Sequence, residues 1–393
     1  MNGTIYKPVG EVCSSISDTY REKKNMVTLI NTSDVLEGRV LNHERVPNSN
    51  LKGQFKKTFQ RDDILYSEIR PQNRRFAYVD FSPIDYIAST KLMVIRAKKD
   101  VVSPKYLYYF LKNSSTVAEL QLLAETRSGT FPQITFSEVA NLTIPVPSLA
   151  VQEVIVQTMQ CLEDKITCNE QINDNLEQQA QSYFQELFVD NADPEWAIGT
   201  ISDLGTVVGG STPSKAKPEY YTESGIAWIT PKDLSINKSK FVSHGENDIT
   251  ELGLKNSSAA IMPEGTVLFS SRAPIGYIAI AAGEVTTNQG FKSVVPKPEI
   301  GTPFVYFFLK NTLPVIEGMA SGSTFKEVSG STMKNVPAVI PDAETLAKFS
   351  DFCAPIFAQQ RILEEQNQSL ATLRDNLLPK LMSGEIDVSA VQL

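Results

Sequence analysis

The chain has 393 residues, of which 41% are hydrophobic and 21% are charged, as expected for a folded protein of about two domains. No apolar run approaches the ~18 residues of a membrane span, and the N-terminus lacks the layout of a signal peptide, so we expect a cytoplasmic protein. The net charge of −8 would exclude a nucleic-acid binder only if it were evenly spread along the chain.

The first expected domain, residues 1–147, alternates short strand-like runs with turns. Runs rich in branched and aromatic residues recur at 26–30, 76–79 and 92–95. A helix is expected to begin at Pro104, because proline is favoured in a first helical turn. The pattern predicts a domain that mixes strands and helices.

This domain is basic although the whole chain is acidic. Residues 1–147 contain 20 Lys and Arg against 15 Asp and Glu, whereas residues 148–193 contain 1 against 9. Basic side chains contact phosphates, and arginine can also bind a guanine edge. The candidate DNA-binding residues form one stretch with aromatic residues between them: Lys52, Lys56, Lys57, Arg61, Arg70, Arg74 and Arg75. A charged loop face without a ligand is the alternative.

Residues 148–190 predict a long helix, and residues 342–393 predict a second one with a C-terminal tail. Apolar residues recur every seven positions in both, a pattern typical of a coiled coil. The expected seam consists of Ile155, Leu162, Ile166, Asn173, Leu176, Leu187, Ile356, Leu363, Asn367, Leu370, Leu377 and Leu381. We expect antiparallel pairing with Asn173 and Asn367 near the middle, where a polar residue fixes the register. Pro355 should kink or start the second helix.

The two helices belong to a repeat that covers the chain. Residues 130–188 and 324–382 align without a gap at a constant offset of 194. The strand and helix patterns of the second domain, residues 191–341, follow those of the first, so the chain is a duplication rather than a solenoid. We therefore predict an α+β protein with two pseudo-symmetric α/β domains separated by an antiparallel coiled coil.

The equivalent surface of the second domain is expected to rely more on hydrogen bonds than on charge. Asparagine and glutamine can read adenine, and serine and threonine can bind a phosphate or a base. The candidate residues are Ser211, Thr212, Lys215, Lys217, Lys232, Ser270, Ser271, Arg272, Asn288 and Gln289.

We expect no catalytic, cofactor-binding or metal site. Residues 205–212 match the spacing of a phosphate-binding loop, but Ser211 stands where the lysine should be. The histidines, His43 and His244, occupy non-matching positions in the two domains, which argues against a metal site or a nucleophile–base pair. Residues 163–165 have a Glu-x-Lys spacing found in nucleases, but they lie on the heptad helix and are interpreted as a solvated face.

Several motifs together resemble one known family. The runs at 209–214, 228–234, 267–276 and 287–290 resemble the target recognition domains of specificity subunits of type I restriction–modification systems. The patterns at 162–177 and 377–385 resemble the family's two spacer helices. The first domain is the poorer match, because it lacks the Gly-Gly-x-Thr-Pro run of the second.

The resemblance implies a non-catalytic subunit that binds double-stranded DNA. Each recognition domain would read half of a bipartite target, and the length of the helix pair would set the unspecified gap. Two modification subunits would dock on it and methylate adenines with S-adenosylmethionine. Restriction subunits, two where present, would add translocation and cleavage driven by ATP and Mg²⁺.

Three alternatives remain open at this point. One is the specificity subunit of a fused restriction–methylation system of another type. Another is a coiled-coil scaffold that joins proteins and does not bind DNA. The third is an enzyme with an unrecognised active site, and the scarcity of histidine and the lack of paired acids in both copies argue against it. The basic excess of residues 1–147 argues against the scaffold.

Overall fold

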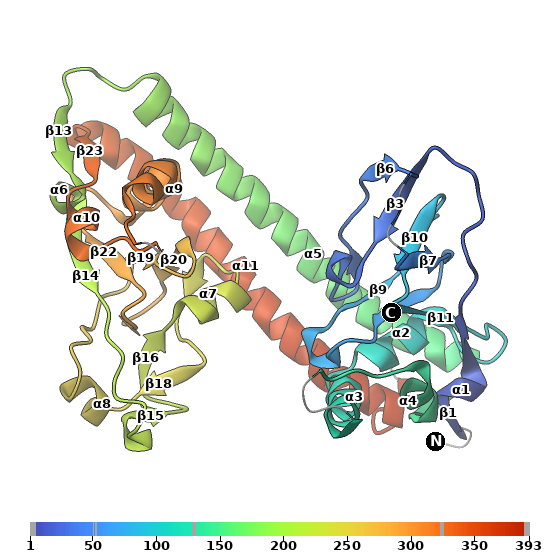
Figure 1. The fold of residues 1–393 in the computed structure, drawn as a ribbon. Coiled ribbons are helices and arrows are strands. Elements are labelled where there is room, and N and C mark those ends of the chain that lie inside the picture. Colours follow the sequence, from blue (N-terminus) through green and yellow to red (C-terminus); the bar gives the residue numbers. More distant parts are fainter. Residues whose placement is uncertain (1–4, 50, 52, 128–130, 323–325, 389–393) are drawn as a thin grey trace. The chain divides into compact units, whose positions relative to one another are not determined.

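The computed structural model describes residues 5–49, 51, 53–127, 131–322 and 326–388 (Figure 1). The chain divides into two compact units. Unit 1 comprises residues 1–166 and 369–393, and unit 2 comprises residues 167–368. Each unit therefore contains one α/β domain together with a part of each of two long helices.

The long helices are α5 (Leu149–Gln185), which continues into a π-helical turn, η3 (Glu186–Asp190), and α11 (Ala343–Ser383). Both were predicted. The expectation that Pro355 could start the second helix is wrong, because α11 begins at Ala343 and includes Pro355. The proline is exposed while its neighbours Cys353 and Ile356 are buried, so seam packing outweighs the backbone hydrogen bond that proline cannot make.

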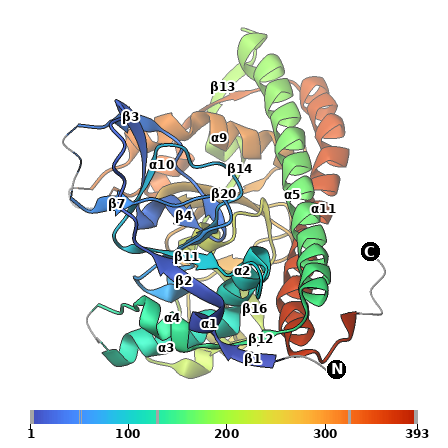
Figure 2. The ribbon, with the colours of Figure 1, turned by 90° about the vertical axis from the view of Figure 1, so that its right-hand side faces the viewer.

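The two helices run antiparallel, as predicted (Figure 2). In unit 2, Asn169 Nδ2 donates to Asn367 Oδ1 at 2.9 Å, and the ring centroids of Tyr183 and Phe352 lie 4.5 Å apart. Residue numbers thus rise along α5 as they fall along α11. In unit 1, Leu162 packs against the core that contains Leu381.

The predicted seam residues all turn at least partly inward. Ile155, Ile356, Leu363 and Leu381 are buried, and the other eight are half-buried. The two seam asparagines do not meet each other. Asn367 meets Asn169, whereas Asn173 Nδ2 lies 3.4 Å from the backbone oxygen of Gln360. The heptad pattern identified the seam, but the register depends on which side chains meet across it.

Asn169 is 0% exposed, and within the described part of the chain its Oδ1 accepts no hydrogen bond. An unsatisfied buried acceptor costs about 1–3 kcal/mol. Replacing both Asn169 and Asn367 by Leu should therefore raise the free energy of unfolding by about 1–2 kcal/mol and loosen the choice of register. Urea unfolding measures the first effect. The second should appear as self-association in light scattering, because a shifted register exposes apolar side chains. Lower stability with an unchanged molar mass would contradict this prediction.

The domain of unit 1 contains two four-stranded sheets. One has the order β2 (Cys13–Ile16), β11 (Leu92–Ala97), β8 (Ile64–Ser67), β9 (Phe76–Tyr78). The other has the order β6 (Arg45–Pro47), β3 (Met26–Ile30), β10 (Tyr86–Ser89), β7 (Phe55–Lys57). The smaller elements are β1 (Ile5–Pro8), α1 (Val9–Val12), η1 (Thr32–Asp34), β4 (Val35–Leu36), β5 (Arg39–Val40), η2 (Pro71–Asn73), α2 (Pro104–Lys112), α3 (Ser114–Arg127), α4 (Phe136–Asn141) and β12 (Thr143–Val146).

The domain of unit 2 contains a five-stranded and a four-stranded sheet. The first has the order β14 (Gly205–Gly209), β22 (Lys292–Pro296), β19 (Val267–Ser271), β20 (Ile275–Ala281), β17 (Phe241–Val242). The second has the order β15 (Tyr221–Thr222), β18 (Asn247–Ile249), β16 (Ile226–Ile229), β21 (Thr286–Thr287). The smaller elements are β13 (Ala197–Thr200), α6 (Ile201–Leu204), η4 (Pro218–Tyr220), α7 (Pro231–Ile236), α8 (Glu251–Lys255), α9 (Thr302–Met319), α10 (Gly330–Lys334) and β23 (Pro337–Ile340).

The topology confirms that the domain is duplicated. The antiparallel order β2-β11-β8-β9 recurs as β14-β22-β19-β20, and the parallel pair β3·β10 recurs as β16·β21. The small sheet β1·β12 recurs as β13·β23. Each domain also packs on the helix pair of its own unit, because residues of α5 and α11 belong to the same hydrophobic cores as α2 and α9. The predicted α+β architecture with two pseudo-symmetric domains is thus confirmed.

Candidate nucleic-acid interface

The basic stretch of the first domain does not form one surface. Lys57 is half-buried, and its Nζ donates to the carbonyls of Thr90 at 3.0 Å and Leu92 at 2.8 Å. Burial lowers the pKa of Lys57. This side chain closes the turn between β10 and β11, so we leave it out of the candidate surface. Lys52 lies outside the described residues.

Arg74 and Arg75 also make contacts inside the domain. Arg75 Nη1 donates to the backbone oxygen of Ser33 at 3.0 Å, and Arg74 Nε lies 3.4 Å from a carboxylate oxygen of Glu37. Both arginines are half-buried. Their charges brace loops of the domain, which leaves Lys56, Arg61 and Arg70 as the exposed members of the predicted cluster.

These exposed residues occupy different places. Arg61 precedes strand β8 and Arg70 follows it, so the two lie at opposite ends of that strand. Of the aromatic residues of the basic stretch, Phe59, Tyr66 and Phe76 are buried and Phe55 is half-buried. The stretch is therefore not a stacking platform, although its exposed cations can still contact phosphates.

In the second domain, two loops meet closely. A Cβ added to Gly210 would lie 2.0 Å from the backbone oxygen of Asn288, so only glycine allows this approach. The backbone N–H of Ser211 donates to Thr287 O at 2.9 Å, and Thr212 Oγ1 is hydrogen-bonded to Gln289 Oε1. The structure thereby brings together Ser211, Thr212, Asn288 and Gln289, which were predicted from separate motifs.

Charged residues lie beside these loops. Pro231 packs near Gly290, since a Cβ on that glycine would lie 2.9 Å from the proline ring, and this places Lys232 next to the loops. Arg272 Nη1 and Lys292 Nζ lie 3.6 and 3.7 Å from the two carboxylate oxygens of Glu327. We call this surface the loop cluster: Ser211, Thr212, Lys232, Arg272, Asn288, Gln289, Lys292 and Glu327.

Lys292 was missed by the sequence analysis, because no motif distinguishes it from other lysines. Its Nζ lies 3.3 Å from the backbone oxygen of Gln289, and burial lowers its pKa although Glu327 opposes the shift. The loop cluster thus combines hydroxyl and amide groups, which can read base edges, with cations that can bind phosphates.

Four other candidates of the second domain lie elsewhere. Ser270 and Ser271 are 0% exposed. Ser270 Oγ donates to Pro274 O at 2.9 Å, and Ser271 Oγ donates to Gly290 O at 3.1 Å. Both hydroxyls therefore stabilise the backbone of the loops from the interior of the domain. We leave these two out of the surface. Lys215 and Lys217 are exposed on the turn that leads into η4.

Glu163 of α5 is not part of a solvated face, contrary to the prediction. It is half-buried, accepts a 2.8 Å hydrogen bond from Tyr109 Oη, and forms an ion pair with Lys112 of α2. The prediction failed because α2 packs on this side of the helix. Asp164 and Lys165 are exposed, as expected.

Comparison with known proteins gives the family. Residues 6–178 and 194–373 match the type I restriction modification DNA specificity domain, one match for each half of the repeat. The chain belongs to this family. It is 29% identical to the type I restriction enzyme HindI specificity subunit of Haemophilus influenzae. The alignment covers 92% of this chain and 94% of that protein.

The chain is also similar to a further relative in sequence and to a solved structure in fold. Over 194 residues the chain is 39% identical to the type I restriction enzyme MjaIX specificity subunit of Methanocaldococcus jannaschii, covering 47% of this chain and 45% of the relative. The crystal structure of the type I restriction–modification S subunit from M. genitalium is similar in fold, with a TM-score of 0.55 and 17% identity over 97% of this chain and 96% of that one. The specificity-domain fold therefore covers both halves of the repeat.

Two further properties can be stated for the part of the chain that the structure describes. It contains no group of three or more His, Cys, Asp or Glu side chains that could hold a metal ion. None of its helices is both long and apolar enough to cross a membrane.

Proposed function

We propose that this chain is the DNA-binding specificity subunit of a type I restriction–modification complex, with each domain reading one half of a bipartite target. The observation that carries the proposal is the duplication: two domains of one topology, each packed on the same two antiparallel helices and each matched by the specificity-domain family. A chain with two readers is suited to a target with two parts.

The energetics favour this division. A correctly read base pair contributes about 1–3 kcal/mol of discrimination, so a domain that reads a few pairs cannot select a rare genomic site. Two linked domains add their discrimination, and a helix pair of set length adds a requirement for one gap. The loop cluster supplies groups that suit such reading in the second domain.

The chemistry of the complex is assigned to partner subunits. We infer that two modification subunits bind this chain and carry S-adenosylmethionine, and that restriction subunits, where present, use ATP and Mg²⁺. In this proposal the chain itself contributes recognition and geometry, not catalysis. Family membership and the two-fold repeat support this arrangement.

Co-expression with the modification subunit tests the proposal. Single-molecule sequencing of the methylated DNA should show adenines modified within two short half-sites separated by a constant gap. Methylation without a bipartite sequence would contradict it. So would binding of the purified chain to other proteins with no affinity for duplex DNA, the result expected of a scaffold.

Salt dependence tests the exposed basic residues of the first domain. Changing Lys56 and Arg61 to Ala should reduce the slope of log Kobs against log salt by about 0.9 for each phosphate that the variant no longer neutralises. Half-site identity should not change, because phosphate contacts carry no sequence information. Lys255→Ala, an exposed lysine paired with Glu251 on α8, is the control. An unchanged slope in the double variant would remove both residues from the interface.

A further inference from the structure

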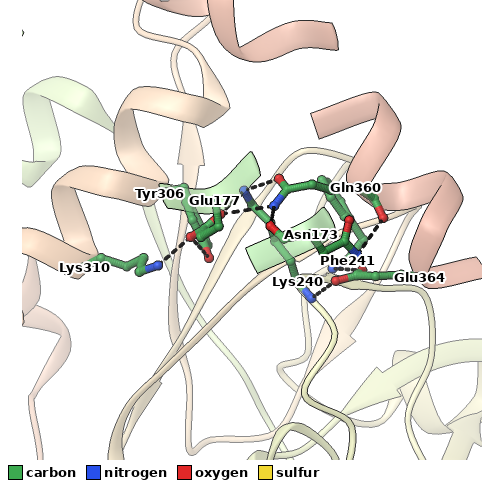
Figure 3. A network of polar contacts seen from close by, with 8 residues as sticks. All are labelled: Asn173, Glu177, Lys240, Phe241, Tyr306, Lys310, Gln360 and Glu364. Carbon is green, nitrogen blue, oxygen red and sulfur yellow. Dashed lines mark hydrogen bonds and ion pairs between the residues drawn. The ribbon is translucent and has the colours of Figure 1, made fainter. Parts of the chain in front are cut away.

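A buried polar network lies within unit 2, where the second domain meets both long helices (Figure 3). Its centre is Lys240, which lies on the segment before β17. The side chain of Lys240 is 7% exposed. Lys240 Nζ lies 2.8 Å from Glu177 Oε2 on α5 and 2.9 Å from Gln360 Oε1 on α11. One lysine of the domain thus contacts both helices at once.

Aromatic rings enclose this ammonium group. Lys240 Nζ lies 3.5 Å from the ring centroid of Phe357, 4.5 Å from that of Tyr306 and 5.2 Å from that of Phe307. Ring faces attract a cation, and the attraction grows when water is excluded. The lysine is therefore held by directional contacts on several sides.

The charges of the pair support each other. Burial lowers the pKa of Lys240 to about 8, although the carboxylate of Glu177 opposes the shift. Burial alone would raise the pKa of Glu177, but the charges of Lys240 and Lys310 outweigh it and lower that pKa to about 2. The attraction between the two groups thus favours the ionised form of both.

Further hydrogen bonds extend the network along both helices. Glu364 of α11 accepts the backbone N–H groups of Lys240 at 2.7 Å and Phe241 at 3.0 Å. On α9, Tyr306 Oη donates to Glu177 Oε1 at 3.1 Å, and Lys310 Nζ pairs with the same oxygen at 2.5 Å. Figure 3 shows these side chains converging from the domain and from the two helices.

A network of this kind specifies geometry more than it adds stability. A buried ion pair gains little over well-packed apolar residues, because desolvation offsets its attraction. Hydrogen bonds and ion pairs are directional, however, so these contacts weaken when the domain rotates on the helices. Hydrogen bonds and ion pairs link the segment at Lys240 to both α5 and α11, and they link α9 to α5. Together they oppose rotation of the domain.

We propose that Lys240 and Glu177 are positioning residues that set the angle at which the second domain presents its loop cluster relative to the helix pair, and thereby set the gap accepted between half-sites. This inference rests on the proposed function and goes beyond it by assigning gap selection to a junction as well as to helix length. Neither residue belongs to the loop cluster, so neither should affect which bases are read.

The test compares the wild-type complex with Lys240→Met and Glu177→Gln complexes, each assembled with the modification subunit. Methylation rates are measured on duplexes that keep both half-sites and change the gap by one or two base pairs. We expect the preference for the native gap to fall at least tenfold in both variants, with unchanged half-sites. Lys255→Met is the matched control and should keep the native preference. A lysine that only stabilised the fold would lower the melting temperature without altering gap preference.

A second measurement keeps the test decisive. Spin labels on Asn311→Cys in α9 and Lys348→Cys in α11, with Cys161 and Cys168 changed to Ser, report the domain–helix distance within unit 2. The distribution should broaden in folded Glu177→Gln. Native gap preference together with an unchanged distribution would overturn the inference. If the wild-type complex itself showed no bipartite preference, the proposed function would fail, and the distances alone would decide whether the pair positions the domain.

Discussion

Inserting one heptad into α5 and one into α11 should lengthen the unspecified gap by about three base pairs and leave both half-sites unchanged. Seven residues add about 10.5 Å of helix at about 1.5 Å per residue. Duplex DNA rises about 3.4 Å per base pair along one strand, which gives the expected increase. The insertions are placed after Ile166 in α5 and after Gln368 in α11. They keep the seventh-residue repeat in phase, because seven residues are one full period of that repeat.

The lengthened target should be bound more weakly than the native one. Three extra base pairs also turn the duplex by about 100°, since a turn contains about 10.5 pairs, whereas a heptad of a coiled coil returns to nearly the same face. Methylation mapping identifies the new gap, and a panel of gap lengths measures the decrease in affinity.

Insertion into α5 alone is the control for the heptad experiment. It would lengthen one helix and leave the other unchanged, so the seam contacts on the two sides of the insertion could no longer share one register, and bipartite methylation should be abolished. Altered half-site bases in the doubly inserted protein would contradict the idea that the helices set only the spacing.

Replacing Glu177 by Ala should lower the free energy of unfolding of unit 2 by about 3–5 kcal/mol. The change leaves the buried ammonium of Lys240 without its carboxylate, and removing one partner of a buried pair costs about this much. Lys240→Met should cost less, because Glu177 keeps its ion pair with Lys310 and its hydrogen bond from Tyr306. Urea unfolding of the two variants measures the asymmetry.

A variant that lacks both charged groups distinguishes two effects: the loss of the attraction between Glu177 and Lys240, and the cost of leaving one charge buried without a partner. Glu177→Ala with Lys240→Met should be more stable than Glu177→Ala alone, because no buried ammonium then lacks a counter-ion. Lys232→Met, which breaks the exposed pair with Glu246, is the surface control and should change stability little. If Glu177→Ala, Lys240→Met and the double variant all lost the same stability, an unpaired buried ammonium would not be the cause of the loss.

The architecture could be predicted from the amino-acid pattern. The seventh-residue repeat predicted both long helices and their seam, and the constant offset of 194 predicted two domains of one topology. These features follow from local periodicity, because a helix that must bury one face repeats its apolar residues at helical spacing. The family resemblance then connected the repeat with DNA recognition.

The surroundings of the individual polar residues could not be predicted in this way and came from the packing of the folded chain. It paired Asn169 with Asn367, buried Ser270 and Ser271, and turned Lys57 inward. It also brought Lys292 into the loop cluster and Lys240 between two helices, and no sequence pattern marked either lysine. The burial of a charge depends on segments that are distant in the chain, such as α9, α5 and α11 around Lys240. Residue types and spacing therefore predict the elements, and packing between the elements decides which charges stay exposed and which are buried between elements.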